Sequence, residues 1–412
     1  MVQLGCSILR GGYKMDTLRV RVYNVRFGDA ILVSVPDRNA SGEIENRHIL
    51  IDVGNILIGE GGANAVFRPV IENILEVLND HPLDLYVMTH EHLDHVQGLL
   101  YASEELGFEI KARYAWLTAS AAEEYYEKHP EAKKCLDEAR KIYGAIECFL
   151  KAVPESQTPW IQTMMLNNDP QSTNDCVKHL RNIADKTTYV YRGCNLTDCH
   201  PFYETRFKIW APEEDTSVYY GRFQPMTLGV TSDQQSRSKP ILTVPKPPPG
   251  VDAGDFYNLV TMRRQGYSDN LLAIDRAANN TSVVFSLEWR GWKLLFAGDA
   301  ERRSWKVMNK YDMLKPVHFL KVSHHGSQTG MPDSGLLEKF LPETSPDNRP
   351  RSAVVCFYPG SYRNVPDEEV LEKELFPRCN VRYVVSPGCD DVKHVEKGTI
   401  PDGGHQDFEF QA

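Results

Sequence analysis

The chain has 412 residues, of which 42% are hydrophobic and 25% are charged, a composition typical of globular proteins with a large apolar core. Its net charge of −10 excludes a generally basic protein that coats DNA, but not an enzyme that binds phosphate through metal ions or a local basic cluster. No apolar run is long enough to span a membrane and nine cysteines follow no framework spacing, so we expect a cytoplasmic protein with reduced thiols.

The N-terminal part predicts an antiparallel start to a sheet. Residues 1–14 are expected to be a disordered extension, and residues 15–412 a single domain interrupted by insertions. Leu18 to Val25 alternates as a half-buried strand does, and the Gly28-Asp29 turn joins it to a partner strand, Ala30 to Val35.

A third strand, His48 to Gly54, places a carboxylate at its end. Burying Asp52 without a partner would be costly, so this side chain is expected either to face a polar pocket or to cap a turn. The helical spacing of apolar residues from Ala63 to Leu78 then predicts an amphipathic helix.

The strongest motif follows the apolar strand Leu83 to Met88, where a helix from Val96 to Leu106 is expected to begin. Four candidate metal ligands lie within six residues of this junction: His90, His92, Asp94 and His95. Imidazole nitrogen and carboxylate oxygen together suit zinc, manganese or iron. Because a strand end and a helix start aim side chains in different directions, the motif suits a pair of metal ions.

The middle of the chain alternates between core strands and insertions. After a strand at Ala112 to Leu117, residues 120–182 are expected to form a helical insertion whose part from 154 to 173 is irregular. Strands at Thr188 to Arg192 and Arg206 to Ala211 are expected to return to the sheet. Residues 213–270 contain Ser, Gln, Gly and Pro clusters, which favour an irregular excursion or lid.

The C-terminal part repeats the pattern of apolar strands that end in ligand-type residues. Two strands joined by a tight turn, Val283 to Trp289 and Trp292 to Ala297, end in Gly298-Asp299. A helix from Glu301 to Asn309 is expected next, and the apolar strand Val317 to Ser323 then ends in His324-His325. An aspartate at such a strand tip is placed to bridge two metals, because each oxygen can serve one ion.

Together these residues resemble the metallo-β-lactamase fold superfamily, and most closely the soluble hydrolase domain of ComEC-type DNA-uptake proteins. The resemblance depends on Asp52 with Gly54, the His90-x-His92-x-Asp94-His95 motif, Asn280-x-Ser282, Gly298-Asp299, the run from Leu320 to Ser327, and Asn364-x-Pro366 with the helix Asp367 to Leu375 and the strand Val381 to Val385. It implies an α/β fold, specifically a four-layer αββα sandwich with the metals at one edge of the two sheets.

Carried over residue by residue, the resemblance implies two divalent ions, zinc or manganese. His90 and His92 would hold the first ion, Asp94, His95 and His324 the second, and Asp299 would bridge them. Asp52 would orient the histidines of the motif. Asp94 would hold and deprotonate the attacking water, and His325 would be left to meet substrate or donate a proton to the leaving group.

The sequence also departs from the superfamily pattern. Many members have a further histidine ligand to the first ion after a middle strand, whereas this strand ends here at Ala211-Pro212. ComEC-type domains also tend to lack that histidine, so its absence favours this branch. Val365 stands where some ComEC-type members have a histidine, which weakens the expectation of substrate contacts there.

Our first hypothesis is a metal-dependent phosphodiesterase, most simply a nuclease acting on DNA, with an effector role in bacterial defence as one consequence. Asn280, Ser282 and Ser327 are candidate hydrogen-bond donors to substrate, while Asn280 and Ser282 are equally expected as turn residues. The insertions are candidate surfaces for a regulatory partner or a second copy. The alternatives are hydrolysis of a small ester, lactone, β-lactam or cyclic nucleotide, and an inactive binding module.

Overall fold

The computed structural model describes residues 17–56, 63–152, 154, 157–224, 247, 249–250, 252–359, 365–387 and 399–412. The expected N-terminal extension, residue Asn364 and most of the Pro-rich stretch lie outside this range. Within the described residues, no helix is both long and apolar enough to cross a membrane.

The first sheet has seven strands in the order β13-β1-β2-β3-β4-β5-β6. Its strands are β1 (Thr17–Tyr23), β2 (Ala30–Arg38), β3 (Ile44–Val53), β4 (Leu83–Met88), β5 (Ala112–Thr118), β6 (Ala184–Val190) and β13 (His405–Gln411). Strands β13, β1, β2 and β3 pair antiparallel, whereas β3 to β6 pair parallel. The parallel half therefore brings the carboxyl ends of β3 and β4 to the same edge.

The second sheet has six strands in the order β12-β11-β10-β9-β8-β7. They are β7 (Arg206–Ala211), β8 (Val284–Trp289), β9 (Trp292–Phe296), β10 (Phe319–Lys321), β11 (Ser352–Cys356) and β12 (Asn380–Val384). Strands β9 to β12 are parallel, so the ends of β9 and β10 also share one edge.

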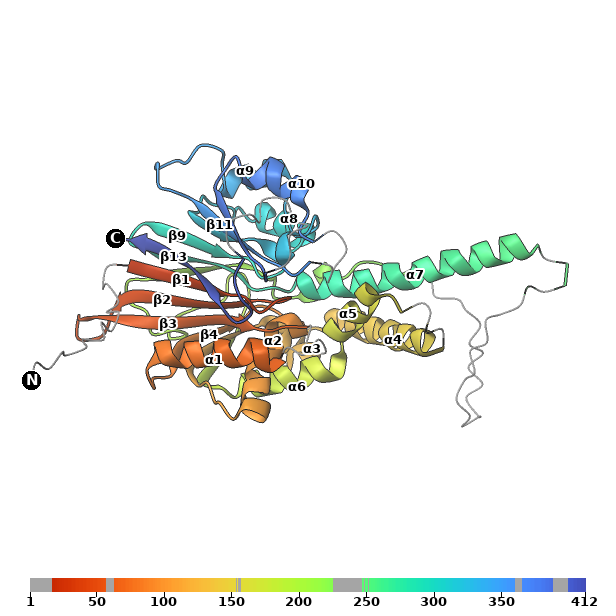
Figure 1. Ribbon diagram of the computed structural model, residues 1–412, viewed down its shortest axis with the longest axis horizontal. Helices are drawn as coiled ribbons and strands as arrows, with labels where there is room; N and C mark the ends of the chain where they lie inside the picture. The colour runs from red at the N-terminus through yellow and green to blue at the C-terminus, as the bar shows by residue number, and fades with distance from the viewer. Residues whose placement is uncertain are drawn as a thin grey trace, which may run out of the picture.

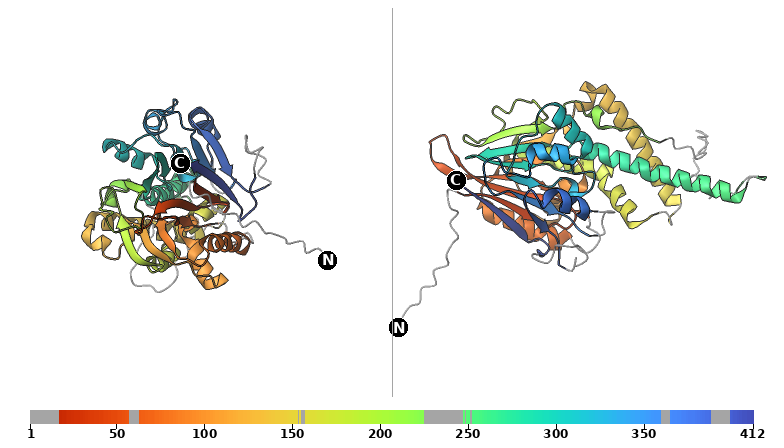
Figure 2. Two further views of the ribbon diagram at one scale, coloured as in Figure 1. Left: turned by 90° about the vertical axis from the view of Figure 1, so that its left-hand side faces the viewer. Right: turned by 90° about the horizontal axis from the view of Figure 1, so that it is seen from above.

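Helices cover the outer face of each sheet, and the two sheets pack against each other (Figures 1 and 2). Helices α1 (Ala63–Leu78), α2 (Leu93–Tyr101) and α6 (Pro170–Arg181) lie on the first sheet, and α8 (Arg302–Lys310), α9 (Ser334–Phe340) and α10 (Glu368–Val370) lie on the second. A third apolar cluster, which includes Val20 and Phe285, fills the space between the sheets. The layer order is therefore αββα, as expected from the sequence.

Both expected insertions are more helical than their sequences suggest. Between β5 and β6 lie α3 (Tyr125–Lys128), α4 (Pro130–Ala152), α5 (Pro159–Asn167) and α6, so the prediction of an irregular stretch from 154 to 173 is wrong. Residues 253–270 were also expected to be irregular, yet they belong to α7 (Ala253–Asn279). This helix extends away from the sandwich beside α4 (Figure 1). The N-terminal end of α7 projects beyond the two sheets (Figure 1).

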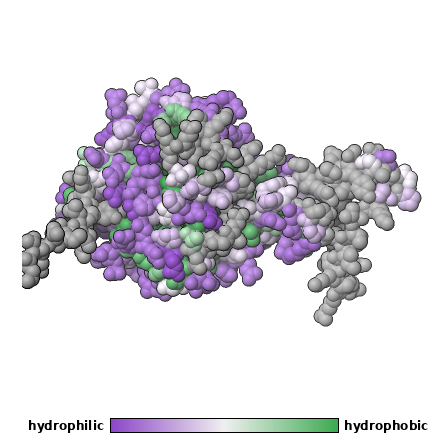
Figure 3. All heavy atoms as spheres, in the orientation of Figure 1, coloured by the Kyte–Doolittle hydropathy of each residue, from purple (hydrophilic) through white to green (hydrophobic). Residues whose placement is uncertain are grey.

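The molecular surface gives little sign of a large apolar contact area. The face shown in Figure 3 is mainly hydrophilic, with apolar residues scattered among the polar ones. Only four large hydrophobic side chains of the described residues are strongly exposed: Leu166, Tyr203, Val218 and Tyr311. Single exposed apolar residues of this kind are normal for globular proteins.

Candidate metal centre

The candidate ligands meet where strands of both sheets end. His90 follows β4, Asp299 follows β9, and His324 and His325 follow β10. Backbone hydrogen bonds join these loops: Val283 N donates to Thr89 O at 2.8 Å, which ties the end of β4 to the start of β8. Because the sandwich brings two strand edges together, residues from both halves of the chain form one site.

Glycine allows the loops to approach this closely. A Cβ atom on Gly54 would lie 2.1 Å from the Asp94 carbonyl carbon and 2.2 Å from the His95 nitrogen. No side chain fits at that distance. The glycine after β3 is therefore needed for the start of α2 to pack against the end of β3.

One group of candidate ligands contains Asp94, His95, Asp299 and His325, with one ligand atom of each within 4.8 Å of the others. His325 Nε2 lies 3.2 Å from Asp94 Oδ2 and 3.3 Å from Asp299 Oδ2. His95 Nε2 lies 3.4 Å from the same Asp299 oxygen. All four side chains are at most 1% exposed. Two imidazoles and two carboxylates thus share one buried space.

A second group consists of His90, His92 and Asp94, so Asp94 belongs to both. His90 Nε2 lies 3.0 Å from His92 Nδ1. Two nitrogens this close cannot both hold protons that point at each other, whereas both can donate lone pairs to one cation. Asp299 also acts on His90 through its charge, which opposes the lowering of the His90 pKa by burial. The two groups form one continuous cluster.

The electrostatics of the cluster favour a bound cation. Burial lowers the pKa of His95, but the charges of Asp299, Asp94 and Asp52 outweigh burial and raise that pKa well above its usual range. Burial raises the pKa of Asp299, yet His325, His95 and Lys321 hold it well below its usual range. The carboxylates therefore stay ionised and demand positive charge nearby.

Two buried polar atoms without hydrogen-bond partners indicate whether the site suits metal ions. Among the described residues, Asp94 Oδ1 and His95 Nε2 are buried and have no hydrogen-bond partner. Buried polar atoms without partners are costly unless a ligand satisfies them. Imidazole and carboxylate donors of this kind suit divalent transition metals, so the residues present fit the implied ions.

Asp52 forms hydrogen bonds with two residues at the end of β4 and the start of α2. Its Oδ2 accepts from Thr89 Oγ1 at 2.6 Å and from His95 Nδ1 at 2.8 Å, and its Oδ1 accepts from Thr89 N at 2.8 Å. Burial raises the pKa of Asp52, while His95 and Thr89 oppose that rise. A proton held on His95 Nδ1 leaves Nε2 as the nitrogen that faces the cluster.

A buried lysine lies beneath the carboxylates. Lys321 of β10 is 1% exposed, forms an ion pair with Asp29 Oδ2 and lies 3.5 Å from Asp299 Oδ1. Sequence reasoning missed both Lys321 and Asp29 as site residues. A charged residue inside the apolar run of β10 was the available signal, because a buried lysine requires a carboxylate partner.

The two adjacent histidines occupy different surroundings. His325 enters the main cluster and its Nδ1 lies 3.0 Å from Cys356 O. His324 instead groups with Asp275 and Glu301, and its Nδ1 lies 2.9 Å from Ser327 Oγ. The geometry thus favours His325, rather than His324, as the imidazole that completes the second ligand set. Both residues have positive φ angles, 47° and 51°, in the turn after β10, and their rings belong to different ligand groups.

The candidate substrate-binding residues mainly serve the protein backbone. Asn280 Oδ1 accepts from Ser304 N at 2.9 Å, and Ser282 Oγ accepts from Asp299 N at 3.0 Å. Ser327 Oγ accepts from Gly330 N at 3.0 Å. These bonds favour the turn-residue alternative for Asn280 and Ser282, and Ser282 fixes the backbone of the candidate bridging aspartate.

The insertions contribute polar side chains that sequence reasoning did not identify. Asn167 Oδ1 accepts from Asp94 N at 3.0 Å, and Asn168 Oδ1 lies 3.0 Å from His92 Nε2. Asn168 Nδ2 in turn donates to Asp275 of α7 at 2.9 Å. The insertion between β5 and β6, together with α7, therefore holds His92 and the start of α2 in place. Histidines 129, 179 and 200 belong to none of the ligand groups among the described residues.

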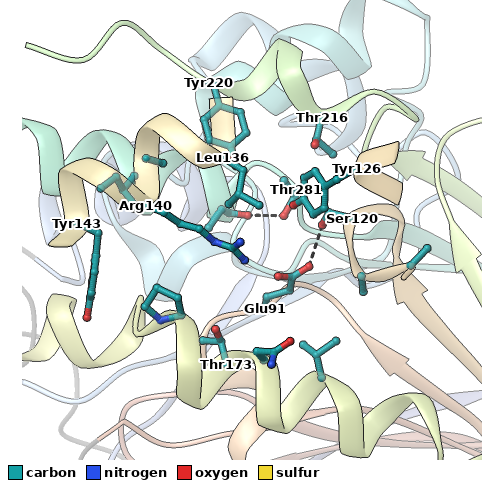
Figure 4. Close-up of a pocket in the computed structure, with 18 of the residues that line it drawn as sticks. Glu91, Ser120, Tyr126, Leu136, Arg140, Tyr143, Thr173, Thr216, Tyr220 and Thr281 are labelled. Carbon is teal, nitrogen blue, oxygen red and sulfur yellow. Dashed lines mark hydrogen bonds between the residues drawn. The ribbon is translucent and has the colours of Figure 1, made fainter. Parts of the chain in front are cut away.

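A cavity of about 250 Å³ adjoins the motif at Glu91 (Figure 4). Its walls come from both insertions and include Tyr126, Arg140, Tyr143 and Tyr220. Glu91 Oε1 accepts from Ser120 Oγ at 3.0 Å. Sequence reasoning did not single out Glu91, because the ligands on either side of it explained the motif.

Comparisons with known proteins assign neither a family nor an activity to this chain. No protein-family model matches the sequence, and no curated protein matches it. Among solved structures, a long-form RNase Z from yeast is similar, with 10% sequence identity and a TM-score of 0.33. The similarity covers 97% of this chain but 42% of the RNase Z chain. A likeness this distant carries no argument about activity, substrates or partners.

Proposed function

We propose that this protein is a metal-dependent hydrolase that cleaves phosphodiester bonds, with DNA as the favoured substrate. The observation that carries the proposal is the buried cluster in which Asp94 belongs to two ligand groups and keeps an oxygen without a partner. Such overlapping sets of imidazoles and carboxylates suit a pair of divalent ions. The ComEC-type resemblance and an effector role in bacterial defence remain predictions.

In this proposal, His90 and His92 would hold one ion, Asp94, His95 and His325 would hold the other, and Asp299 would contribute a further carboxylate ligand. The predicted ligand His324 is thus replaced by His325, whose Nε2 faces both carboxylates. Zinc or manganese at these positions would supply Lewis acidity toward a phosphoryl oxygen and lower the pKa of a water molecule. Thr89 and Asp52 fix the orientation of His95.

The protein groups then account for the proton transfers. Asp94 Oδ1, which has no hydrogen-bond partner, would accept a proton from the attacking water, whose oxygen forms the new bond to phosphorus while the P–O bond to the leaving group breaks. His324 takes the role first predicted for His325, donation of a proton to the leaving oxygen. Its ring is held by Ser327 at 2.9 Å, outside the main ligand group.

A cationic side chain near the site favours a phosphate-bearing substrate despite the net charge of −10. The Arg276 side chain is 52% exposed, and its Nε lies 3.8 Å from Glu301 Oε2, in the group that contains His324. A half-exposed guanidinium at this position can contact a substrate phosphate while its other edge stays paired.

The test is hydrolysis by the purified chain with manganese or zinc. Substrates are linear, circular and single-stranded DNA, RNA, bis-p-nitrophenyl phosphate and nitrocefin. We expect phosphodiester cleavage that falls by a factor on the order of 10²–10⁴ in Asp94→Asn. The exposed Asp312→Asn is the matched control and should retain activity. Turnover of nitrocefin without phosphodiester cleavage, or metal binding without any turnover, would contradict the proposal.

A further inference from the structure

The cavity beside the metal motif has no role in the chemistry described above. It meets the motif at Glu91, whose neighbours His90 and His92 belong to a ligand group and do not line the cavity. Successive side chains thus point to opposite sides here: the imidazoles of His90 and His92 face the ligand cluster, and the carboxylate of Glu91 faces the cavity. The cavity volume, about 250 Å³, suits one small planar group rather than a folded partner.

Several polar groups in the cavity have no partner in the described part of the protein. The Arg140 guanidinium and the hydroxyls of Tyr126 and Tyr220 form no hydrogen bond, although all three residues line the cavity. Glu91 uses Oε1 for its bond to Ser120, which leaves Oε2 without one. Arg140 is exposed, while Glu91, Tyr126 and Tyr220 are half-buried, so these groups line a cavity that is open to solvent on one side. A carboxylate, a guanidinium and aromatic hydroxyls that converge on one cavity are the kind of polar groups that orient a small ligand.

The arrangement of these groups defines the ligand. The Arg140 guanidinium points toward Glu91 in Figure 4, and the charge of Arg140 acts on that carboxyl, yet the two form no ion pair. A ligand that fits between them must present donors to the carboxylate and acceptors to the guanidinium. The tyrosine rings nearby favour a flat aromatic body, as in proteins that hold unstacked bases.

We propose that this cavity binds a guanine base. Guanine offers N1–H and its 2-amino group as adjacent donors for Glu91, and O6 and N7 as acceptors for Arg140. Adenine lacks the adjacent pair of donors, and uracil lacks the amino group. The base comes either from a nucleic-acid substrate, in which case the inference rests on the proposed function, or from a free nucleotide.

The first experiment measures binding without catalysis. Titration calorimetry with 5′-GMP, AMP and UMP is run on the full chain in EDTA, so that cleavage plays no part. We expect saturable GMP binding, at least about tenfold tighter than AMP, because a mismatched base leaves charged groups unpaired.

Two variants away from the metal ligands test the cavity itself. Arg140→Gln and Tyr220→Phe should each weaken GMP binding, Arg140→Gln by about tenfold or more, because hydrogen bonds to charged groups are the stronger ones. Lys141→Gln is the matched control, since it removes a charge from the same helix at an exposed position outside the cavity. Absence of GMP binding, equal binding of AMP, or an equal loss in Lys141→Gln would overturn the inference.

A second arm identifies the source of the base. If the base belongs to the substrate, Arg140→Gln should lower kcat/KM for guanine-containing oligonucleotides but not for oligothymidine. If it belongs to a free nucleotide, added GMP should change oligothymidine cleavage by the native chain but not by Arg140→Gln. GMP binding without any cleavage would contradict only the proposed function and leave the guanine pocket supported.

Discussion

Replacement of the buried lysine beneath the metal cluster gives the most quantitative prediction. Lys321→Met removes the cation that pairs with Asp29 and lies 3.5 Å from Asp299 Oδ1. Both aspartates are 1% exposed, so solvent cannot replace the lost charge. Methionine has a similar length and is apolar, so the loss should report on charge rather than on packing.

The size of the effect follows from the geometry. At an effective dielectric of about 20, unit charges 3.5 Å apart interact by about 5 kcal/mol. Desolvation of the lysine offsets part of this, and removal of one partner from a buried pair typically costs about 3–5 kcal/mol. We therefore expect Lys321→Met to lower the free energy of unfolding of the metal-free protein by about 3–5 kcal/mol. The pKa of Asp299, which the lysine helps to hold down, should rise.

Urea unfolding at pH 7 in EDTA measures this loss. The double variant Asp29→Asn/Lys321→Met should recover part of the stability, because one of the two uncompensated carboxylates is gone. Lys315→Met is the matched control: this lysine pairs with Asp312 on the surface, and its loss should cost less than about 1 kcal/mol. A loss in Lys321→Met no larger than in this control would refute the reasoning.

Three further predictions concern the cluster. Gly54→Ala should abolish metal binding in a metal titration, because the new Cβ would lie 2.1 Å from the backbone of the motif. Gly144→Ala is the control: open space surrounds Gly144, so this variant should bind metal normally in the same titration. Asp52→Asn should weaken metal affinity by about 10–100-fold in the same titration, because it disturbs the orientation of His95. Burial lowers the pKa of His325, but Asp299 and Asp94 outweigh burial and raise that pKa to about 9. The proton on His325 therefore stabilises the metal-free protein fully below about pH 6.5, and this stabilisation is lost as the pH rises through about 9. Metal binding at pH 7 should therefore release protons, measured by calorimetry in buffers of different ionisation enthalpy; no proton release would contradict this.

The sequence predicted those parts of the fold that local patterns determine. The strands at Leu83–Met88 and Arg206–Ala211 and the helix at Ala63–Leu78 begin and end where predicted, because apolar periodicity and flanking turn residues mark them. Strand β13 was missed: it forms by pairing with β1, Leu18 opposite Phe410, across almost the whole chain. Phe408 and Phe410 alternate with polar residues as in a half-buried strand, but the partner strand lies at the other end of the chain, so local patterns do not predict the pairing.

At the candidate metal centre, too, residues marked by local patterns could be predicted, whereas contacts between distant segments could not. The motif His90 to His95 and the aspartate after β9 could be read from strand ends, and the structure places them together. The orientations of His324 and His325 could not be predicted from the sequence, because the tight turn that contains them determines which ring enters the cluster. The roles of Asn168 and Asp275 could not be predicted from the sequence either, because these residues contact the site only after α5 and α7 pack against it.

Anomalous diffraction from crystals grown with manganese or zinc tests the central claim most directly. The account predicts two anomalous peaks per chain, one bound by Asp94, His95 and His325 and the other by His90 and His92, with Asp299 contacting the space between them. Asp299→Asn crystals prepared in the same way should lose or weaken both peaks. Saturated crystals with no metal at these side chains, or with ions bound only elsewhere, would contradict the account.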